Sequence, residues 1–225
     1  MMIHYVSIDR PSVTFLFMKL QKFQNSFNRR PILNAILLYG FYTLCFFVTE
    51  QLNTREAFLV HSVLDDLIPF SKYAVIPYCL WFPEIAIVLL YIYFRGDQKE
   101  FFRAVFLPVL LMFCSLLLYY LFPTEIHLRP DTVPGNDLFA WLTRFIYSVD
   151  NSKNVCPSIH VAVSYLMGDL WQRNTDHKTG IIMIVLNIII SISTLFLKQH
   201  SFIDVVAGLL YGRLIRFIYD RLFSD

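Results

Sequence analysis

Long apolar runs separated by short charged segments dominate the pattern of the chain. Apolar runs of roughly 17–25 residues are typical of helices that span a bilayer. The pattern predicts such helices at residues 31–48, 73–94, 101–122, 158–171, 181–197 and 202–218, of which the fourth is the shortest. We therefore expect an all-α fold, a polytopic membrane bundle of about six transmembrane helices.

Two segments outside these runs have patterns of their own. Residues 1–30 mix phenylalanines with lysines and have no small-residue cleavage site, which favours a helix at the membrane surface over a signal peptide. Residues 123–157 form the longest connection, and 137–149 place apolar side chains on one helical face. We expect an N-terminal cytoplasmic or interfacial segment at 1–30 and an integral-membrane domain at 31–225, with 123–157 as its active-site loop.

The basic residues predict how the chain is oriented in the membrane. If the N-terminus lies inside and six helices span the bilayer, most of the 19 lysines and arginines fall on inner segments. An excess of Lys and Arg marks the cytoplasmic side of membrane proteins. We therefore expect a multi-pass protein of the cell membrane with both termini in the cytoplasm. Loop 123–157 then lies on the extracytoplasmic face.

Composition agrees with membrane residence and narrows the function classes. Hydrophobic residues make up 56% of the 225 residues, above the range of about 45–50% that is usual for soluble domains. The net charge is only +2 and the chain has no lysine-rich block, so nucleic acid is not an expected partner. The four cysteines lie far apart, without a C-x-x-C pair or a Cys/His cluster. We expect neither a metal nor a cofactor.

His200 and Asp204 are four residues apart at the start of the last apolar run. On a helix this spacing puts both side chains on one face. A carboxylate beside an imidazole orients the ring and stabilises its positive charge, which leaves the other ring nitrogen available as a base or nucleophile. The alternative is a helix-start pair in which Asp204 acts on the N-terminal helix dipole.

A second polar group lies in and after the long loop. Ser158 and His160, in the run Pro157-Ser158-Ile159-His160, lie where a loop becomes a helix, a position whose free N–H groups favour an anion. Arg129 adds a cation whose planar guanidinium matches phosphate oxygens. The alternatives are an ordinary interfacial histidine for His160 and a lipid-headgroup contact for Arg129.

The order of these residues resembles the motifs of the type 2 phosphatidic acid phosphatase (lipid phosphate phosphatase) superfamily, which are K-x6-R-P, P-S-G-H and S-R-x5-H-x3-D. The resemblance implies a membrane-embedded phosphatase that hydrolyses a lipid phosphomonoester or pyrophosphate through a phosphohistidine, without metal. By this resemblance, His200 corresponds to the nucleophile, Asp204 to its orienting carboxylate and His160 to the general acid. Arg129 and Ser158 correspond to phosphate ligands.

Three positions depart from the family motifs. Ile159 replaces the motif glycine, Phe122 stands at the lysine position, and Thr194 stands at the arginine position. Two expected cations are therefore missing. Lys198 lies two residues before His200 and is a candidate replacement as a phosphate ligand; the alternative is a lysine that extends to the membrane interface.

The segment at 198–205 also resembles the H-Y-x-x-D-V stretch of sphingomyelin and inositol phosphorylceramide synthases, which implies transfer of a phosphorylated headgroup to a lipid hydroxyl. Hydrolysis is the preferred hypothesis, with headgroup transfer as the alternative. A non-catalytic membrane scaffold is a third hypothesis, because two motif cations are missing. The expected partners are a lipid phosphate and the bilayer.

The remaining polar residues are expected to have structural or surface roles. Asp150 precedes the Pro157 motif and is expected to position the loop by capping. His61, Asp65 and Asp66 have no metal-ligand spacing, and His127 is expected to be a surface histidine.

Overall fold

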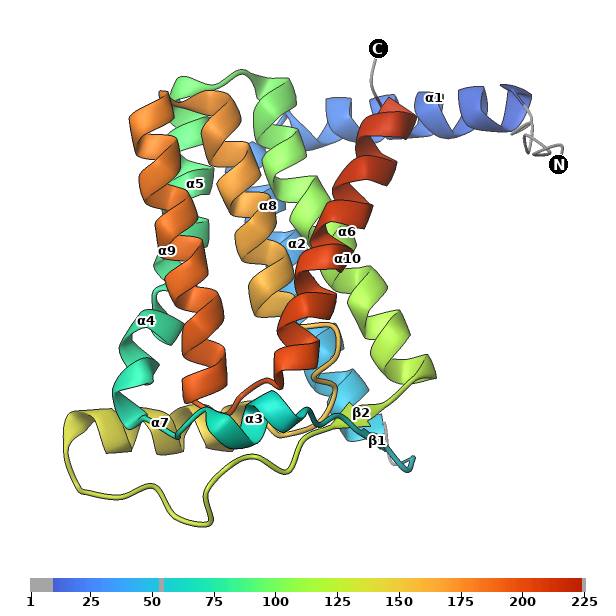
Figure 1. Ribbon diagram of the computed structural model, residues 1–225. Coiled ribbons are helices and arrows are strands. Elements are labelled where there is room, and N and C mark those ends of the chain that lie inside the picture. The colour runs from blue at the N-terminus through green and yellow to red at the C-terminus, as the bar shows by residue number, and fades with distance from the viewer. Residues whose placement is uncertain (1–9, 53–54, 224–225) are drawn as a thin grey trace, which may run out of the picture.

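The computed structural model describes residues 10–52 and 55–223, and this part of the chain folds into a helical bundle (Figure 1). Its long helices are α1 (Arg10–Phe27), α2 (Pro31–Leu52), α5 (Trp81–Arg95), α6 (Gln98–Leu121), α8 (Ile159–Asn174), α9 (His177–Phe196) and α10 (Phe202–Phe223). Shorter elements are β1 (Phe58–Leu59), α3 (Val63–Leu67), a 3-10 turn (Lys72–Ala74), α4 (Val75–Cys79), β2 (Thr124–Glu125) and α7 (Leu138–Val149). The prediction of an all-α bundle is confirmed.

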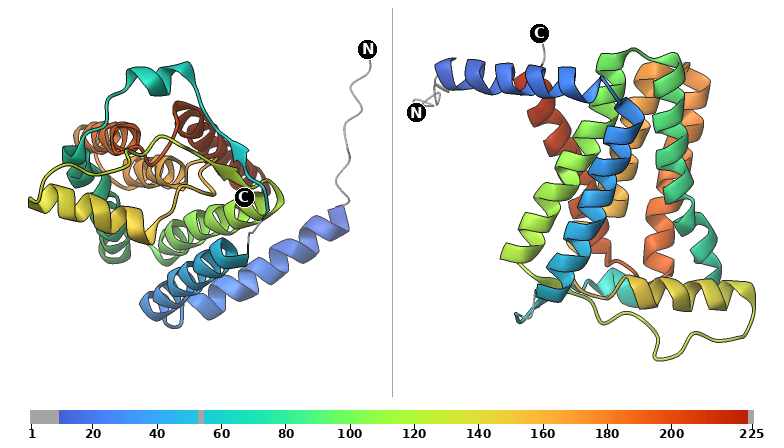
Figure 2. Two further views of the ribbon diagram at one scale, coloured as in Figure 1. Left: turned by 90° about the horizontal axis from the view of Figure 1, so that it is seen from below. Right: turned by 180° about the vertical axis from the view of Figure 1, so that it is seen from behind.

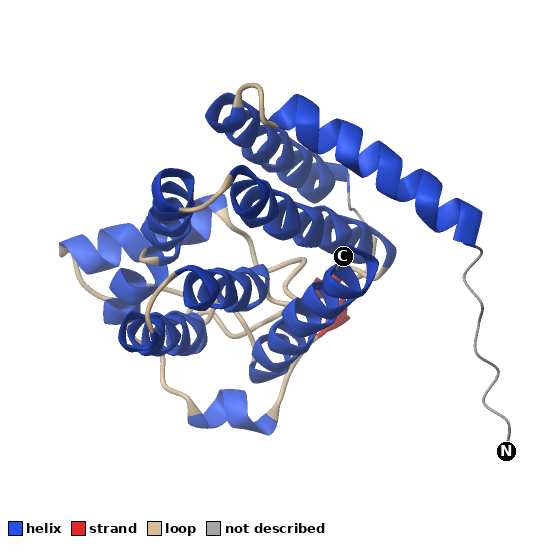
Figure 3. Cartoon of the chain, turned by 90° about the horizontal axis from the view of Figure 1, so that it is seen from above, coloured by secondary structure: helices blue, strands red, loops and turns tan. Residues whose placement is uncertain are grey.

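Helix α8 lies at the centre of the bundle. It packs on α5, α6, α9 and α10, and Figure 3 shows the bundle helices nearly end-on. Its buried residues include Val163, Leu166, Met167 and Leu170, which are fully enclosed. The helix runs from the candidate site, near Ile159, to the opposite end of the bundle, near Asn174.

Four segments in the described part of the chain are long and apolar enough to cross a membrane. They are Pro31–Leu52, Lys72–Arg95, Gln98–Leu121 and His177–Phe196, which makes the chain a multi-pass membrane protein. The predicted count of six is not confirmed. Helix α8 has 16 residues, or about 24 Å at 1.5 Å per residue. Helix α10 is long enough but carries charged residues at 204, 213, 216, 220 and 221.

Short elements close the two ends of the bundle. Helices α3 and α7 lie across one end, and α1 lies across the other, where α10 also ends (Figures 1 and 2). Phe23 and Phe27 of α1 pack on Phe102 of α6, with ring centroids 5.9 and 5.3 Å apart. The cytoplasmic side of this end, and the interfacial role of 1–30, stay predictions; residues 1–9, 53–54 and 224–225 lie outside the described part.

The long loop is attached to the rest of the protein at several points. Strand β2 pairs with β1 in parallel, and Glu125 forms an antiparallel bridge with Lys153. The hydroxyl of Thr124 accepts hydrogen bonds from the backbone N–H groups of Val155 and Cys156, both at 3.1 Å. The helix expected at 137–149 is present as α7, capped by Asp137. These contacts fix the loop over the start of α8.

Candidate active site

His200 lies in the tight connection between α9 and α10. The backbone N–H groups of Gln199 and His200 donate to the carbonyl of Thr194, at 2.9 and 3.3 Å, and so close the end of α9. Lys198 has a positive φ of 55°, which reverses the chain direction. The reversal places the His200 side chain inside the bundle end, where only 7% of the residue is exposed.

The predicted His200–Asp204 pair is present in the structure. His200 Nδ1 lies 3.5 Å from Asp204 Oδ2, and Asp204 is fully buried. The same Oδ2 accepts the backbone N–H of Ser201 at 2.8 Å, so Asp204 also caps the start of α10. The geometry thus shows Asp204 as a helix cap, whereas its 3.5 Å contact with the His200 ring is at ion-pair distance and is not a hydrogen bond. The role of Asp204 as the orienting carboxylate stays a prediction.

His160 meets the other side of the His200 ring. Its Nδ1 lies 3.4 Å from His200 Nε2. The rings of Tyr78 and Trp81 lie on His160 with centroids 4.6 Å away in each case. His200 thus has a carboxylate at one ring nitrogen and an imidazole at the other.

Ser158 joins the starts of α8 and α10. Its hydroxyl accepts the backbone N–H of Val161 at 3.4 Å, and its own N–H donates to the carbonyl of Asp204 at 3.1 Å. The side chain is completely buried. The structure therefore brings Ser158, His160, His200 and Asp204 together, and uses Ser158 as the N-cap of α8.

Two glycines allow this close approach of α8 and α10. A Cβ at Gly208 would lie 2.6 Å from the carbonyl oxygen of Ser158, and one at Gly212 would lie 2.9 Å from that of Ala162. Small residues four apart are a known signal for close helix contacts in membranes. This Gly-x-x-x-Gly spacing in α10 could have been recognised in the sequence.

Arg129 reaches the site through hydrogen bonds to the protein. Its guanidinium donates to the carbonyls of Asp150 and Asn151, both at 2.8 Å, and to the side-chain oxygen of Gln199. It also lies over the ring of Tyr147, 4.3 Å from the centroid. Arg129 thus contacts Gln199, the residue that precedes His200 in the sequence. Its role as a phosphate ligand stays a prediction.

Asp150 adds a carboxylate that the sequence analysis treated only as a cap. Its Oδ2 accepts the hydroxyl of Tyr78 at 3.2 Å and the side-chain N–H of Gln199 at 3.5 Å. Burial raises the pKa of Asp150, against the lowering effects of His200 and Arg129. The candidate site thus carries an additional acidic group beside its arginine.

Lys198, the candidate replacement for a missing cation, holds the loop to α3. Its ammonium donates to the backbone carbonyls of Asp65, at 2.7 Å, and Ile68. The Asp65 carboxylate accepts the hydroxyl of Ser201 at 2.6 Å and the backbone N–H of Phe202 at 2.7 Å. Lys198 therefore holds the connection before His200 to α3 and the residue that follows it. Its role as a phosphate ligand stays a prediction. The sequence analysis considered Asp65 only as a metal ligand and did not predict its contact with Ser201.

A cavity of about 700 Å³ extends from His160 and Asp150 between α2 and α5. Both helices pack on α6, and the cavity lies in the space between them. Its walls are mostly apolar and include Tyr39, Phe46, Phe82, Ile85 and Leu89. Apolar pockets with a few polar groups at one end are typical of ligand sites.

The described residues contain no group of three or more His, Cys, Asp or Glu side chains that could hold a metal ion. The residues that the structure does gather are two imidazoles, a carboxylate and the start of a helix. This set can supply a nucleophile, a proton donor and an anion-binding backbone.

Comparison with known proteins identifies the family. The sequence model described as the PAP2 superfamily matches residues 44–215, which include every candidate site residue named above. No curated protein and no solved structure matches the chain. Since the match covers most of the 225 residues, the chain belongs to the PAP2 superfamily.

Proposed function

We propose that the protein is a lipid phosphatase that hydrolyses a lipid phosphomonoester or pyrophosphate through a phosphohistidine, without metal. The observation that carries this proposal is the position of His200 between its two partners. Nδ1 faces Asp204 at 3.5 Å, and Nε2 faces His160 at 3.4 Å. A histidine held in this way has a nucleophilic nitrogen on the side where a proton donor also lies.

In the proposed first step, His200 Nε2 attacks phosphorus as the bond from phosphorus to the lipid oxygen breaks. Asp204 stabilises the positive charge that develops on the His200 ring. His160 donates its proton to the departing oxygen, so a phosphomonoester leaves as the lipid alcohol and a pyrophosphate leaves as the lipid monophosphate. A phosphoryl group between the two nitrogens requires the His160 ring to move away from its 3.4 Å contact with His200.

In the second step, His160 takes a proton from water and the resulting hydroxide attacks phosphorus. The nitrogen–phosphorus bond breaks, phosphate is released and His200 is restored. Phosphoryl transfer depends mainly on positioning and on neutralising the phosphate oxygens. We assign this to Arg129 and to the backbone at the start of α8, where Ser158 is the N-cap.

The apolar cavity supports a lipid as the substrate. Its walls come from α2 and α5, and His160 and Asp150 line one end. A lipid chain in this cavity would stay in apolar surroundings while its phosphate reached His200. The orientation predicted from Lys and Arg placement puts this reaction on the extracytoplasmic face of the membrane.

The balance of charges around the histidines favours headgroup transfer as a second candidate function. Arg129 and Lys198 both donate to backbone carbonyls, and Asp150 adds a carboxylate beside Arg129. A phosphodiester carries one negative charge fewer than a fully ionised phosphomonoester, so it needs less positive charge around it. In this version, a lipid hydroxyl replaces water in the second step.

One assay distinguishes the candidates. Purified protein in nanodiscs is given phosphatidic acid, a polyprenyl pyrophosphate or a phospholipid with a labelled headgroup, with chelator present and with or without a lipid alcohol. Free phosphate supports hydrolysis, and label on the alcohol supports transfer. His200→Ala should abolish either reaction. His127→Ala is the control, because His127 is 69% exposed in loop 123–157, and its replacement should leave the rate unchanged.

Full activity of His200→Ala would refute the nucleophile assignment. Activity that disappears with chelator and returns with a divalent ion would refute metal independence. Absence of turnover across the whole panel would favour the non-catalytic scaffold.

A further inference from the structure

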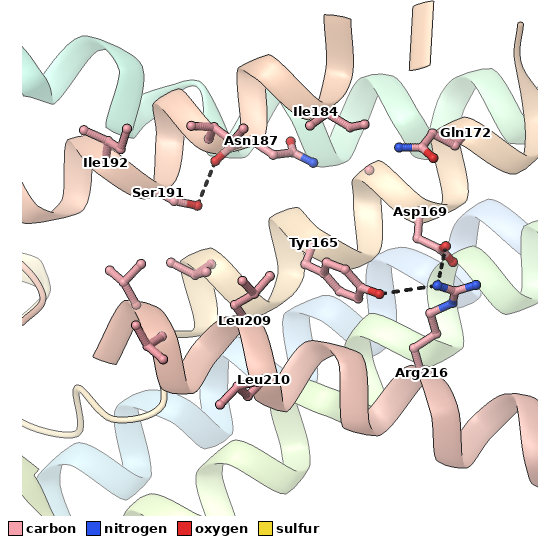
Figure 4. Close-up of a pocket in the computed structure, with 15 residues that line it drawn as sticks. Tyr165, Asp169, Gln172, Ile184, Asn187, Ser191, Ile192, Leu209, Leu210 and Arg216 are labelled. Atoms are coloured by element: carbon pink, nitrogen blue, oxygen red, sulfur yellow. Dashed lines mark hydrogen bonds and ion pairs between the residues drawn. The ribbon is translucent and has the colours of Figure 1, made fainter. Parts of the chain in front are cut away.

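A second groove lies between α8, α9 and α10 (Figure 4). The α8 residues that line it are not those that line the apolar cavity. Its volume is about 580 Å³. Apolar side chains from α9 and α10 form its walls, among them Ile184, Ile188, Ile192, Leu209 and Leu210. Leu210 and Ile188 are 60% and 52% exposed, so the groove opens on the outer surface of the bundle.

One end of the groove is charged. Arg216 contacts Asp169 at 3.0 Å and donates to the hydroxyl of Tyr165 at 3.3 Å (Figure 4). Asp169 also pairs with Arg173 at 2.9 Å. Arg173 and Arg216 contact Asp220, at 3.2 and 3.5 Å.

The same cluster includes a further arginine. Asp220 pairs with Arg103 of α6, so three arginines share two aspartates and the cluster carries a net positive charge. The side chains of Arg173 and Arg216 are 33% and 32% exposed. Arg216 lines the groove, so an anion at this end can reach its guanidinium group.

A polar group also lies midway along the groove. The Asn187 amide donates to the carbonyl of Ser164 at 2.7 Å, whereas its oxygen Oδ1 is buried without a hydrogen-bond partner in the described part of the chain. Gly168 makes room for this side chain, since a Cβ there would lie 2.3 Å from the Asn187 nitrogen. The groove thus has a polar side chain between its apolar part and its charged end.

We propose that this groove binds an anionic phospholipid from the leaflet opposite the histidine site. The chains lie along α9 and α10, past Asn187, and the phosphate meets Arg216 at the charged end. The net positive charge of the cluster selects an anionic headgroup over a zwitterionic one. Asp169 lies nine residues after His160 on α8, or about 14 Å along the helix axis, so this lipid site is separate from the active site.

The test is native mass spectrometry of protein released from nanodiscs made of equal parts phosphatidylcholine and phosphatidylglycerol. Wild-type protein should retain phosphatidylglycerol preferentially. Arg216→Gln should lower that preference about fivefold, the effect expected for one cation beside an anionic lipid. Arg213→Gln is the control, because Arg213 is exposed on the same helix and does not line the groove.

Leu210→Trp tests the apolar part independently of the charge cluster. The larger side chain fills the groove and should reduce retention of both lipids. Leu214→Trp, one turn further on and 53% exposed, should behave as wild type. Equal retention of the two lipids by wild-type protein would overturn the proposal, as would unchanged retention in Leu210→Trp. A dimer that Leu210→Trp dissociates, without loss of lipid, would instead identify the groove as an interface between two copies.

Discussion

Replacing Asp65 by alanine removes the carboxylate that joins α3 to the start of α10. This carboxylate accepts the backbone N–H of Ser62 at 2.7 Å, the hydroxyl of Ser201 at 2.6 Å and the backbone N–H of Phe202 at 2.7 Å. Hydrogen bonds to a charged group contribute about 1.5–3 kcal/mol each. The hydrogen bonds from the Ser201 hydroxyl and the Phe202 N–H together contribute about 3–6 kcal/mol to stability. Asp65→Ala should lower the free energy of unfolding by an amount in this range.

The same change should affect turnover more than substrate binding. Ser201 directly follows His200, so loss of its hydrogen bond to Asp65 loosens the backbone that holds the proposed nucleophile. A displacement of about 1 Å at a reacting group can lower the rate about 100-fold. We expect kcat to fall by up to this factor, with little change in KM.

The measurements are chemical unfolding and steady-state kinetics on the lipid phosphate that the wild type turns over. Asp66→Ala is the matched control, because its side chain is 63% exposed and contacts His61. Asp65→Asn keeps one acceptor oxygen and should recover part of both losses. If Asp65→Ala and Asp66→Ala had the same unfolding free energy and the same kcat, Asp65 would not position the His200 loop.

Three further predictions concern helix contact, the missing cation and pH. Gly208→Ala should lower stability by about 1–3 kcal/mol, because its Cβ would lie 2.6 Å from the Ser158 carbonyl oxygen. Gly40→Ala, inside α2 with no atom within 4 Å of its Cβ, should be at least as stable as the wild type because alanine favours a helix over glycine. Equal unfolding of the two variants would contradict the packing argument. Thr194→Arg should not add a usable cation, because Thr194 is fully buried and its carbonyl closes the end of α9; a lower melting temperature without a gain in rate is expected, and a gain in rate would show that the site accepts the family's arginine. Burial raises the pKa of Asp150, so its carboxyl group stays protonated in the folded state at pH values where the unfolded chain, with a pKa of about 3.9, has already lost the proton. The stability that this proton contributes is lost as pH rises from the unfolded pKa through the folded pKa. Asp150→Asn should flatten the fall, measured as melting temperature against pH; Asp131→Asn is the control, and an unchanged slope in Asp150→Asn would refute the assignment.

Local sequence patterns predicted the parts of the site that depend on helix periodicity. Ser158 was expected at the point where a loop becomes a helix, and it directly precedes α8. The spacing of His200 and Asp204 assumed that both lie on one helix, whereas His200 lies before α10 (Phe202–Phe223), with its Nδ1 3.5 Å from Asp204. The all-α fold followed from the apolar runs. The count of six spans is not confirmed, because α8 has only 16 residues and charged side chains lie among the apolar residues of α10.

Contacts between distant segments were beyond these patterns. Asp65 is 136 residues from Ser201, and nothing in the spacing near either residue indicates that they meet. Arg129 looked like an available cation because its type matches phosphate. Its partners, the carbonyls of Asp150 and Asn151, depend on how the loop folds over the start of α8. Periodicity gives the face of a helix, whereas the partner of a loop residue depends on the tertiary fold.

The central claim is that His200 carries the phosphoryl group during turnover. Wild-type protein should be mixed briefly with a lipid phosphate labelled at phosphorus, quenched in alkali, in which phosphohistidine survives, and mapped by mass spectrometry. We predict label on the peptide that contains His200, stable to alkali and lost in acid, and none in His200→Ala. Label on another residue, or equal labelling of His200→Ala, would contradict the account.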